Sequence, residues 1–339
     1  MPSLTLEATG IPEEVEAGDP TNRRVELMLG ALASAVLLFI AGMIIFTLIK
    51  AWPSFANNGL AWFGAGGNVD QQLSDIFNSP ADPADYVYEL RAWPLIWSTI
   101  LISGLSVVFA TFIAVFSSIF IVHFAPTALQ KLIEPVVKYL AAVPSVVYGL
   151  IGILVIVPWI NNNLITEQMR ASVAYVIQLD GSSVMAATMI LTVMILPIMI
   201  ALIVDSLRAV PLNWREGALA LGVNKWRAVR TVSVRAIRPA IVAAAVLATA
   251  RALGEAIMLA MVAGSIGFAP NPFDGILFLF EPSRPLAPSI LDGEEGLSVV
   301  PFGETMYAFG FILIVSCVFF SFSGWAIRQS LSRYGIGAR

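Results

Sequence analysis

Long apolar runs separated by polar connections dominate the pattern of this chain. Each of the six runs is close to or longer than the roughly 20 residues that a helix needs to cross a membrane. Tryptophans near several run ends are typical of the membrane–water interface. The pattern therefore predicts an all-α integral membrane protein with six transmembrane helices, at Leu27–Ile49, Trp93–Val122, Pro135–Ile160, Ser182–Leu207, Pro239–Gly264 and Thr305–Ser330.

Basic residues are distributed unevenly among the connections between these runs. Seven of the 19 Lys and Arg residues lie in the connection 208–238. The connections 50–92 and 265–304 are instead long and acidic. Because basic residues gather on the cytoplasmic side of membrane proteins, the pattern predicts both termini in the cytoplasm and these two acidic connections as outer loops.

The amino-terminal segment 1–22 differs from the rest of the chain. It is polar and acidic, and it lacks the basic start and short apolar core of a signal peptide. We expect a mobile cytoplasmic tail, with a docking segment as the alternative. The domain organisation is then this tail followed by one membrane domain, 23–339.

Composition narrows the possible functions. The chain has 339 residues, of which 58% are hydrophobic and 12% charged, with a net charge of −4. It holds one cysteine, Cys317, and one histidine, His123, so neither a disulfide nor a multi-histidine metal site can form within it. The Gly-Lys pair of a phosphate-binding P-loop is absent from the sequence. We therefore expect no catalytic residues, no bound metal or cofactor, and no nucleic-acid partner.

Two charged residues interrupt the fifth apolar run. Arg251 and Glu255 lie in ATARALGEAIMLAMVAG (248–264), and on a continuous helix they would share one face. Arg251 is roughly 18 Å from Pro239 at 1.5 Å per residue, near the middle of a bilayer. A central Arg costs about 2.5–3.5 kcal/mol on insertion scales, so it needs a structural or functional reason. Either the pair is an intrahelical salt bridge, or Arg251 binds an oxyanion while Glu255 keeps the empty site near neutral.

The connection 208–238 predicts a helical hairpin with a glycine turn. Asn213 and Glu216 have the spacing of a capping box, so a first helix is expected to begin at Asn213. Gly222 fits the left-handed position that ends a helix, and Asn224 can cap a second, basic helix. Two interpretations remain open: a hairpin that rests on anionic lipid, or a lever that docks in a groove of a cytoplasmic partner.

The same connection resembles a known motif. REGALALG (215–222), followed by a basic helix, is similar to the E-A-A-x-x-x-G loop of ATP-binding-cassette (ABC) importer permeases. Gly217 stands where the second motif residue is usually Ala, and the Pro of the family's I-x-L-P ending is missing. The resemblance implies a coupling loop that contacts a separate ATPase through Glu216, Gly217, Ala218, Gly222, Val223 and Asn224.

A second resemblance is more specific and covers most of the chain outside the tail and outer loops. RALGEAIMLAMVAG (251–264) is similar to the R-A-L-G-E-T motif of phosphate-specific permeases. AWPSFANNGLAWF (51–63), LAAVPSVVYGL (140–150) and the carboxy-terminal GAR resemble the C-type subunits of that family. The resemblance implies a type I ABC importer permease fold, and it favours an oxyanion role for Arg251 and Glu255. Ser145 and Tyr148 beside Pro144 are further pathway candidates, with helix packing as the alternative.

The resemblance also implies an assembly in the bacterial cytoplasmic membrane. The expected partners are a second homologous permease subunit in a heterodimer, two copies of an ABC ATPase that bind the ATP, an external phosphate-binding protein, inorganic phosphate and the lipid bilayer. The alternatives are a permease for molybdate, sulfate or phosphonate, an ion-coupled secondary transporter that acts alone, and a membrane sensor.

Overall fold

The computed structural model describes residues 20–332. The GAR motif and nearly all of the expected tail lie outside these residues. The described part consists of helices, turns and loops with one isolated bridge, so the all-α prediction is confirmed. The α-helices are α1 (Pro20–Asn58), α2 (Val69–Phe77), α3 (Trp93–Ile119), α4 (Thr127–Ala141), α5 (Ser145–Ile151), α6 (Val157–Asn163), α7 (Glu167–Val173), α8 (Val184–Arg208), α9 (Leu212–Ala220), α10 (Lys225–Ala228), α11 (Val234–Ala236), α12 (Arg238–Leu253), α13 (Ile257–Val262), α14 (Leu286–Asp292) and α15 (Val300–Ser332).

Shorter helical turns join several of these elements. The π-helical turns are Phe120–Phe124, Gly152–Ile156 and Val229–Ser233. The 3₁₀ turns are Gly59–Phe63, Pro83–Asp85, Pro272–Leu279 and Glu294–Gly296.

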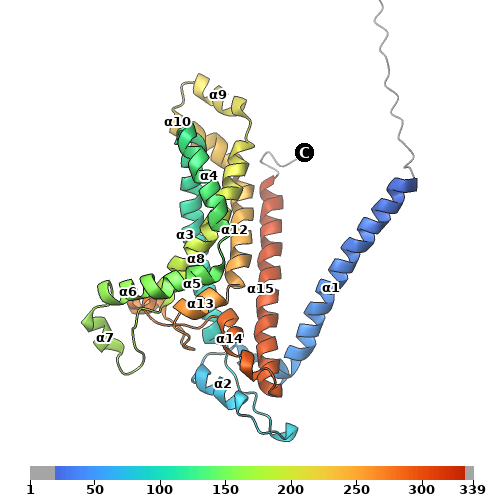
Figure 1. Ribbon diagram of the computed structural model, residues 1–339, viewed down its shortest axis with the longest axis vertical. Helices are drawn as coiled ribbons and strands as arrows, with labels where there is room; N and C mark the ends of the chain where they lie inside the picture. The colour runs from blue at the N-terminus through green and yellow to red at the C-terminus, as the bar shows by residue number, and fades with distance from the viewer. Residues whose placement is uncertain (1–19, 333–339) are drawn as a thin grey trace, which may run out of the picture. The chain divides into compact units, whose positions relative to one another are not determined.

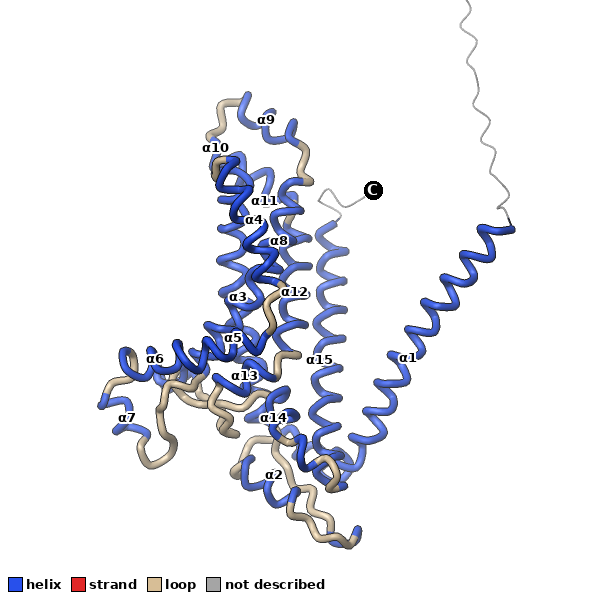
Figure 2. The backbone as a smooth tube through the Cα atoms, viewed as in Figure 1, coloured by secondary structure: helices blue, strands red, loops and turns tan. Residues whose placement is uncertain are grey.

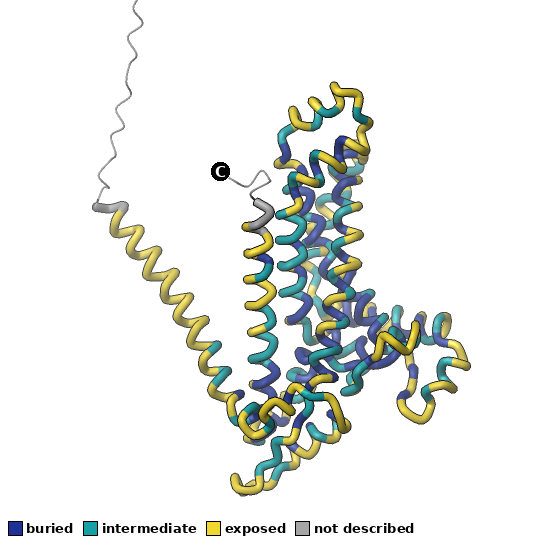
Figure 3. Tube along the Cα trace, turned by 180° about the vertical axis from the view of Figure 1, so that it is seen from behind, coloured by how far each residue is buried: buried dark blue, intermediate teal, exposed yellow. Residues whose placement is uncertain are grey.

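Helix α1 belongs to two structural units, of which the first ends at Phe46 and the second begins at Thr47. Within the first unit, the side chains from residue 23 to residue 43 are all exposed (Figure 3). This stretch is apolar enough to cross a membrane. Its exposed apolar side chains therefore need lipid or another protein around them.

The second unit is built around α8, which packs against α3, α4 and α12 (Figures 1 and 2). Ser183 begins α8 by accepting a hydrogen bond from the N–H of Ala186. Most of α8 is buried. Hydroxyl residues lie at its contact with α3, where Ser106 donates to the Thr188 carbonyl at 3.2 Å. Such hydrogen bonds between helices are typical of membrane interiors.

Helix α15 packs along α12 at a glycine. A Cβ atom at Gly324 would lie 2.8 Å from Cγ1 of Val246 and closer still to its Cγ2. The absence of a side chain at Gly324 therefore brings the two helices together.

Within residues 20–332, five helical segments are long and apolar enough to cross a membrane, and a sixth is a pair bent by 64°, Lys225–Ala236 and Arg238–Leu253. This agrees with the predicted six spans. The second, fourth and sixth predicted runs each correspond to one continuous helix. The third and fifth are wrong as continuous helices, because both are broken part-way.

The connections gather at two ends of the second unit (Figure 1). The basic connection 208–238 lies at one end, beside the turn after α3, where Lys225 Nζ is 4.8 Å from the ring centroid of Phe124. The loops 50–92 and 265–304 meet at the other end. The structure thus separates the basic and acidic connections as the charge pattern predicts.

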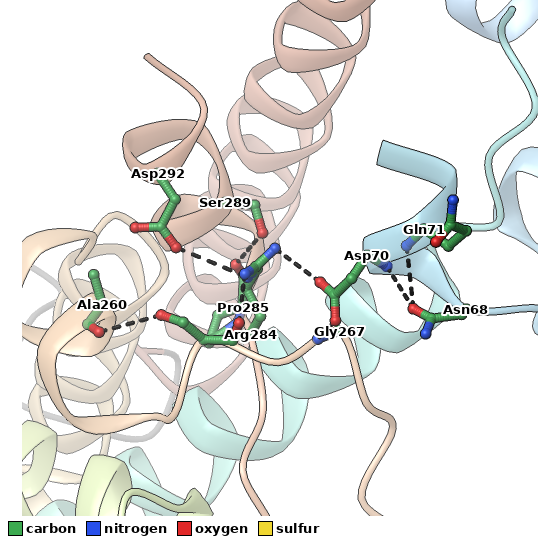
Figure 4. Close-up of polar contacts among 10 residues, drawn as sticks. Asn68, Asp70, Gln71, Ala260, Gly267, Arg284, Pro285, Ser289 and Asp292 are labelled. Carbon is green, nitrogen blue, oxygen red and sulfur yellow. Dashed lines mark hydrogen bonds and ion pairs between the residues drawn. The ribbon is translucent and has the colours of Figure 1, made fainter. Parts of the chain in front are cut away.

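Arg284 ties the acidic loops together (Figure 4). Its Nη1 donates to Asp70 Oδ1 at 2.9 Å, and its Nε lies 3.8 Å from Asp292 Oδ2. Its Nη2 donates to the Ser265 carbonyl, and Asp70 Oδ2 accepts the N–H of Gly267 at 2.9 Å. One guanidinium therefore joins α2, the segment that follows α13, and α14.

Candidate functional site

The third and fifth predicted runs are each interrupted once. Helix α4 ends at Ala141 and α5 begins at Ser145, whereas α12 ends at Leu253 and α13 begins at Ile257. Pro144 disfavours helical backbone in the residue before it, and its fixed φ suits a helix start, which explains the first break.

The two breaks lie close together because α5 packs on α13. A Cβ atom at Gly149 would lie 2.7 Å from Met261 Sδ and 3.2 Å from Met258 Cα. Gly149 thus lets the two helices approach closely, as small residues do inside membranes. This contact is about one turn from the start of each helix.

Arg251 and Glu255 lie on opposite sides of the second break. Arg251 is half-buried in the last turn of α12, whereas Glu255 follows the end of that helix. The Glu255 Oε1 accepts the N–H of Met258, in the first turn of α13, at 3.3 Å. No ion pair joins Arg251 to Glu255 among the described residues. The expectation of one shared helix face is wrong, because four-residue spacing brings side chains together only on an unbroken helix.

Tyr148 and Ser145 lie beside the first break. The Tyr148 hydroxyl donates to the Leu140 carbonyl at 2.9 Å, across the break. The packing of α5 on α13 brings the two breaks into one neighbourhood. Ser145 is half-buried and begins the helical segment Ser145–Asn163. The structure therefore groups all four predicted pathway residues at the breaks.

The charges of this neighbourhood suit an anion. The Arg251 guanidinium forms no ion pair with a carboxylate in the described part of the chain. The start of the segment Ser145–Asn163 adds backbone N–H groups that lack helical acceptors and carry partial positive charge. Pro144 and Gly254 at the breaks are exposed in the single chain. The arrangement can therefore attract an oxyanion.

The basic connection begins with α9, which projects from the end of the second unit (Figure 1). Pro211 directly precedes its first residue, and no side chain caps that end. The predicted capping box of Asn213 and Glu216 is wrong, because Pro211 presets the backbone and starts the helix earlier. No residue of α9 is buried, and a Cβ atom at Gly217 would meet open space.

The corner between α9 and α10 is the predicted glycine turn. Gly222 has a φ of +79°. Its N–H donates to the Leu219 carbonyl at 2.9 Å, and the Val223 N–H donates to the Ala218 carbonyl at 3.3 Å. These two bonds define a Schellman motif. The Asn224 Oδ1 then accepts a backbone N–H of α10 at 2.8 Å, so the turn and the cap are confirmed.

Sequence reasoning missed the side chain that ties α9 to the membrane helices. Arg215 Nη1 lies 2.7 Å from Nδ1 of His123, 92 residues away in the chain. From the sequence, His123 is only a single histidine, which is too few for a multi-histidine metal site. Its place directly after the second apolar run, level with a basic loop, is the one signal that points to this contact.

Comparison with known proteins identifies the family. Residues 123–333 match the family described as binding-protein-dependent transport system inner membrane component. The chain belongs to this family. This inner membrane component is 31% identical over 259 residues to the probable ABC transporter permease protein YqgH of Bacillus subtilis, which corresponds to 75% of the chain and 77% of YqgH. It is 32% identical over 305 residues to the phosphate transport system permease protein PstC 2 of Mycobacterium tuberculosis, or 86% and 87% of the two chains.

The fold of the inner membrane component also occurs in a solved transporter. A chain of the bacterial alginate ABC transporter, crystallised with an alginate-bound periplasmic protein, matches 93% of this chain and 99% of its own length. The TM-score is 0.53 and the identity 13%, a likeness that shows the fold alone. The predicted ABC importer permease fold is confirmed, and the chain is a multi-pass membrane protein of a transport family.

Proposed function

We propose that this inner membrane component is the permease subunit of an ATP-driven importer of inorganic phosphate and forms half of its translocation pathway. The observation that carries the proposal is the similarity, along 86% of the chain, to a permease named for phosphate transport. The anion-attracting neighbourhood at the two breaks supports it.

In this proposal the breaks line the phosphate route. Phosphate loses part of its hydration inside a membrane and needs a compensating charge, which the planar guanidinium of Arg251 supplies in a fork that matches two oxygens. Ser145 and the N–H groups beside it add donors, and Tyr148 borders the same space. Glu255 limits how long the anion is held, because its negative charge lies across the second break from Arg251 and repels the anion.

The coupling loop docks on a separate ATPase in this proposal. The exposed apolar side chains of α9 and its turn support a protein partner, since Leu212 and Leu221 are 62% and 86% exposed. Glu216 and Gly217 lie on the same open helix. The full assembly then contains a second permease subunit, two ATPase subunits that bind ATP, and an external phosphate-binding protein.

Uptake of labelled phosphate by the assembled transporter tests the pathway. Arg251→Gln should abolish uptake and leave the ATPase bound, whereas Glu255→Gln should slow turnover because the anion is held longer. The double variant should stay inactive. Recovered uptake in the double variant would contradict a substrate role for Arg251. Competition by molybdate, sulfate or phosphonate that exceeds that of phosphate would assign another oxyanion, and uptake by this chain alone would indicate a secondary transporter.

Chemical labelling tests the orientation with both termini in the cytoplasm. Single cysteines near positions 75 and 285 should react with a membrane-impermeant reagent from outside the cell. Cysteines near positions 128 and 225 should not react. The reversed pattern would contradict both the orientation and the docking of α9 on a cytoplasmic ATPase.

A further inference from the structure

Both arms of the coupling loop contact the same turn at the inner end of α3. This α3 turn is the π-helical segment Phe120–Phe124. Arg215 of α9 reaches His123 with a nitrogen–nitrogen distance of 2.7 Å. From α10, Lys225 Nζ lies 4.8 Å from the Phe124 ring centroid, and the Trp226 ring is 6.4 Å away. The α3 turn is thus held from two sides.

The chemistry of the pair fixes the state of His123. An arginine guanidinium only donates hydrogen bonds, so Nδ1 of His123 must accept and the ring is neutral with its proton on Nε2. His123 is 8% exposed, and its Nε2 has no partner within the described residues. The acceptor nitrogen of this buried ring is therefore committed to α9.

Helix α9 is otherwise loosely attached to the membrane helices. None of its residues is buried. A cavity of about 230 Å³ lies beside the pair, lined in part by Leu207, Pro211 and Arg215. Helix α9 can therefore shift without displacing a packed core, and the Arg215–His123 contact passes such a shift to the α3 turn.

Helix α3 leads without a break from this turn to the outer loops. At its far end, Trp97 Nε1 donates to the Pro270 carbonyl at 2.7 Å, and Ser98 donates to the Phe268 carbonyl at 3.3 Å. The Leu286 N–H donates to Thr99 Oγ1 at 2.9 Å. The two spans that carry the proposed pathway are broken at residues 142–144 and 254–256, whereas α3 is continuous. Helix α3 is therefore a stiffer connection than these spans between the loop 208–238 and the outer loops.

We propose that His123 is a positioning residue that couples the position of α9 to α3, and through α3 to the outer loop 265–304. The inference rests on the proposed function, in which α9 docks on the ATPase. ATP binding then reaches the outer loop through the α3 turn, in addition to its effect on the spans that carry the pathway.

The test uses the complete transporter in liposomes, with phosphate uptake measured per ATP hydrolysed. His123→Leu removes the acceptor and should lower this ratio at least tenfold while the ATPase still co-purifies. His123→Gln keeps an acceptor oxygen and should restore the ratio to within about threefold. Arg215→Gln, at a half-buried position, is the second variant should His123→Leu fail to assemble. Thr231→Val is the control, because Thr231 bonds only the Arg227 carbonyl within the same loop.

A second readout is independent of the substrate. Adding ATP to the wild-type complex should change the hydrogen exchange of residues 265–270. His123→Leu should lose this response, and His123→Gln should keep it. A wild-type ratio and a normal ATP response in both His123→Leu and Arg215→Gln would overturn the inference, as would a parallel loss of assembly and uptake that His123→Gln does not rescue. Failure of the wild-type complex to take up phosphate would instead contradict the proposed function.

Discussion

Replacing Arg284 by Gln should loosen the contact between the two outer loops. The ion pair with Asp70 joins side chains that are 20% and 36% exposed. Its contribution therefore lies between that of exposed pairs, about 0.2–1 kcal/mol, and the cost of breaking a buried pair, about 3–5 kcal/mol. We expect local opening to become easier by about 1–3 kcal/mol, which corresponds to roughly 5- to 150-fold.

Hydrogen exchange at Gly267 measures this opening, because its N–H is held by Asp70. Exchange should accelerate by that factor in Arg284→Gln and by less in Arg284→Lys, which keeps the charge. The matched control is Glu167→Gln. Glu167 is 94% exposed in its pair with Arg170, so its removal should leave exchange unchanged. Unchanged exchange at Gly267 in Arg284→Gln would refute the reasoning.

Three further outcomes follow from packing, capping and burial. Gly324→Ala should destabilise the α12–α15 contact by about 1–3 kcal/mol, measured by thermal unfolding of the purified complex. Adding Val246→Ala to this variant should recover part of the lost stability, and additive losses would contradict the contact. Asn224→Ala should weaken the turn by about 0.5–2 kcal/mol and reduce ATPase co-purification, whereas Asn224→Asp should preserve both. Burial and the nearby Asp274 raise the pKa of Glu281 above its ordinary value of 4.5. Because the folded loop holds this proton more tightly than the unfolded chain, stability should fall as pH rises above about 4.5, and Glu281→Gln should remove that slope in melting curves.

The sequence predicts the membrane helices well where one apolar run forms one helix. Length and hydropathy suffice for α3, α8 and α15, because lipid leaves a continuous helix as the way to satisfy the backbone. They do not reveal the breaks. The residues around Ala142 are small or apolar and so continue the pattern although the helix stops there. At Gly254 the neighbouring charges, Arg251 and Glu255, keep the four-residue spacing of a helix and so do not mark the break either.

The sequence predicts which residues belong to the candidate site better than it predicts how they are arranged. A charge inside an apolar run indicates a function wherever the helix ends, and so Arg251 could be found without the break. Gly222 and Asn224 were predictable because turns and caps depend on neighbouring residues. Asn213 was misplaced because Pro211 competes for the helix start. The Arg215–His123 contact could not be predicted as a pair, since its two residues are 92 positions apart and no local pattern joins them.

The two breaks also bear on how the protein is made. Each leaves backbone N–H and C=O groups without helical partners, and hydrocarbon chains offer none. Ala142, Pro144 and Gly254 are exposed at these points in the single chain. A chain inserted alone therefore exposes polar backbone to lipid at both breaks. In the proposed assembly, balanced synthesis of the subunits therefore protects each chain at its two breaks.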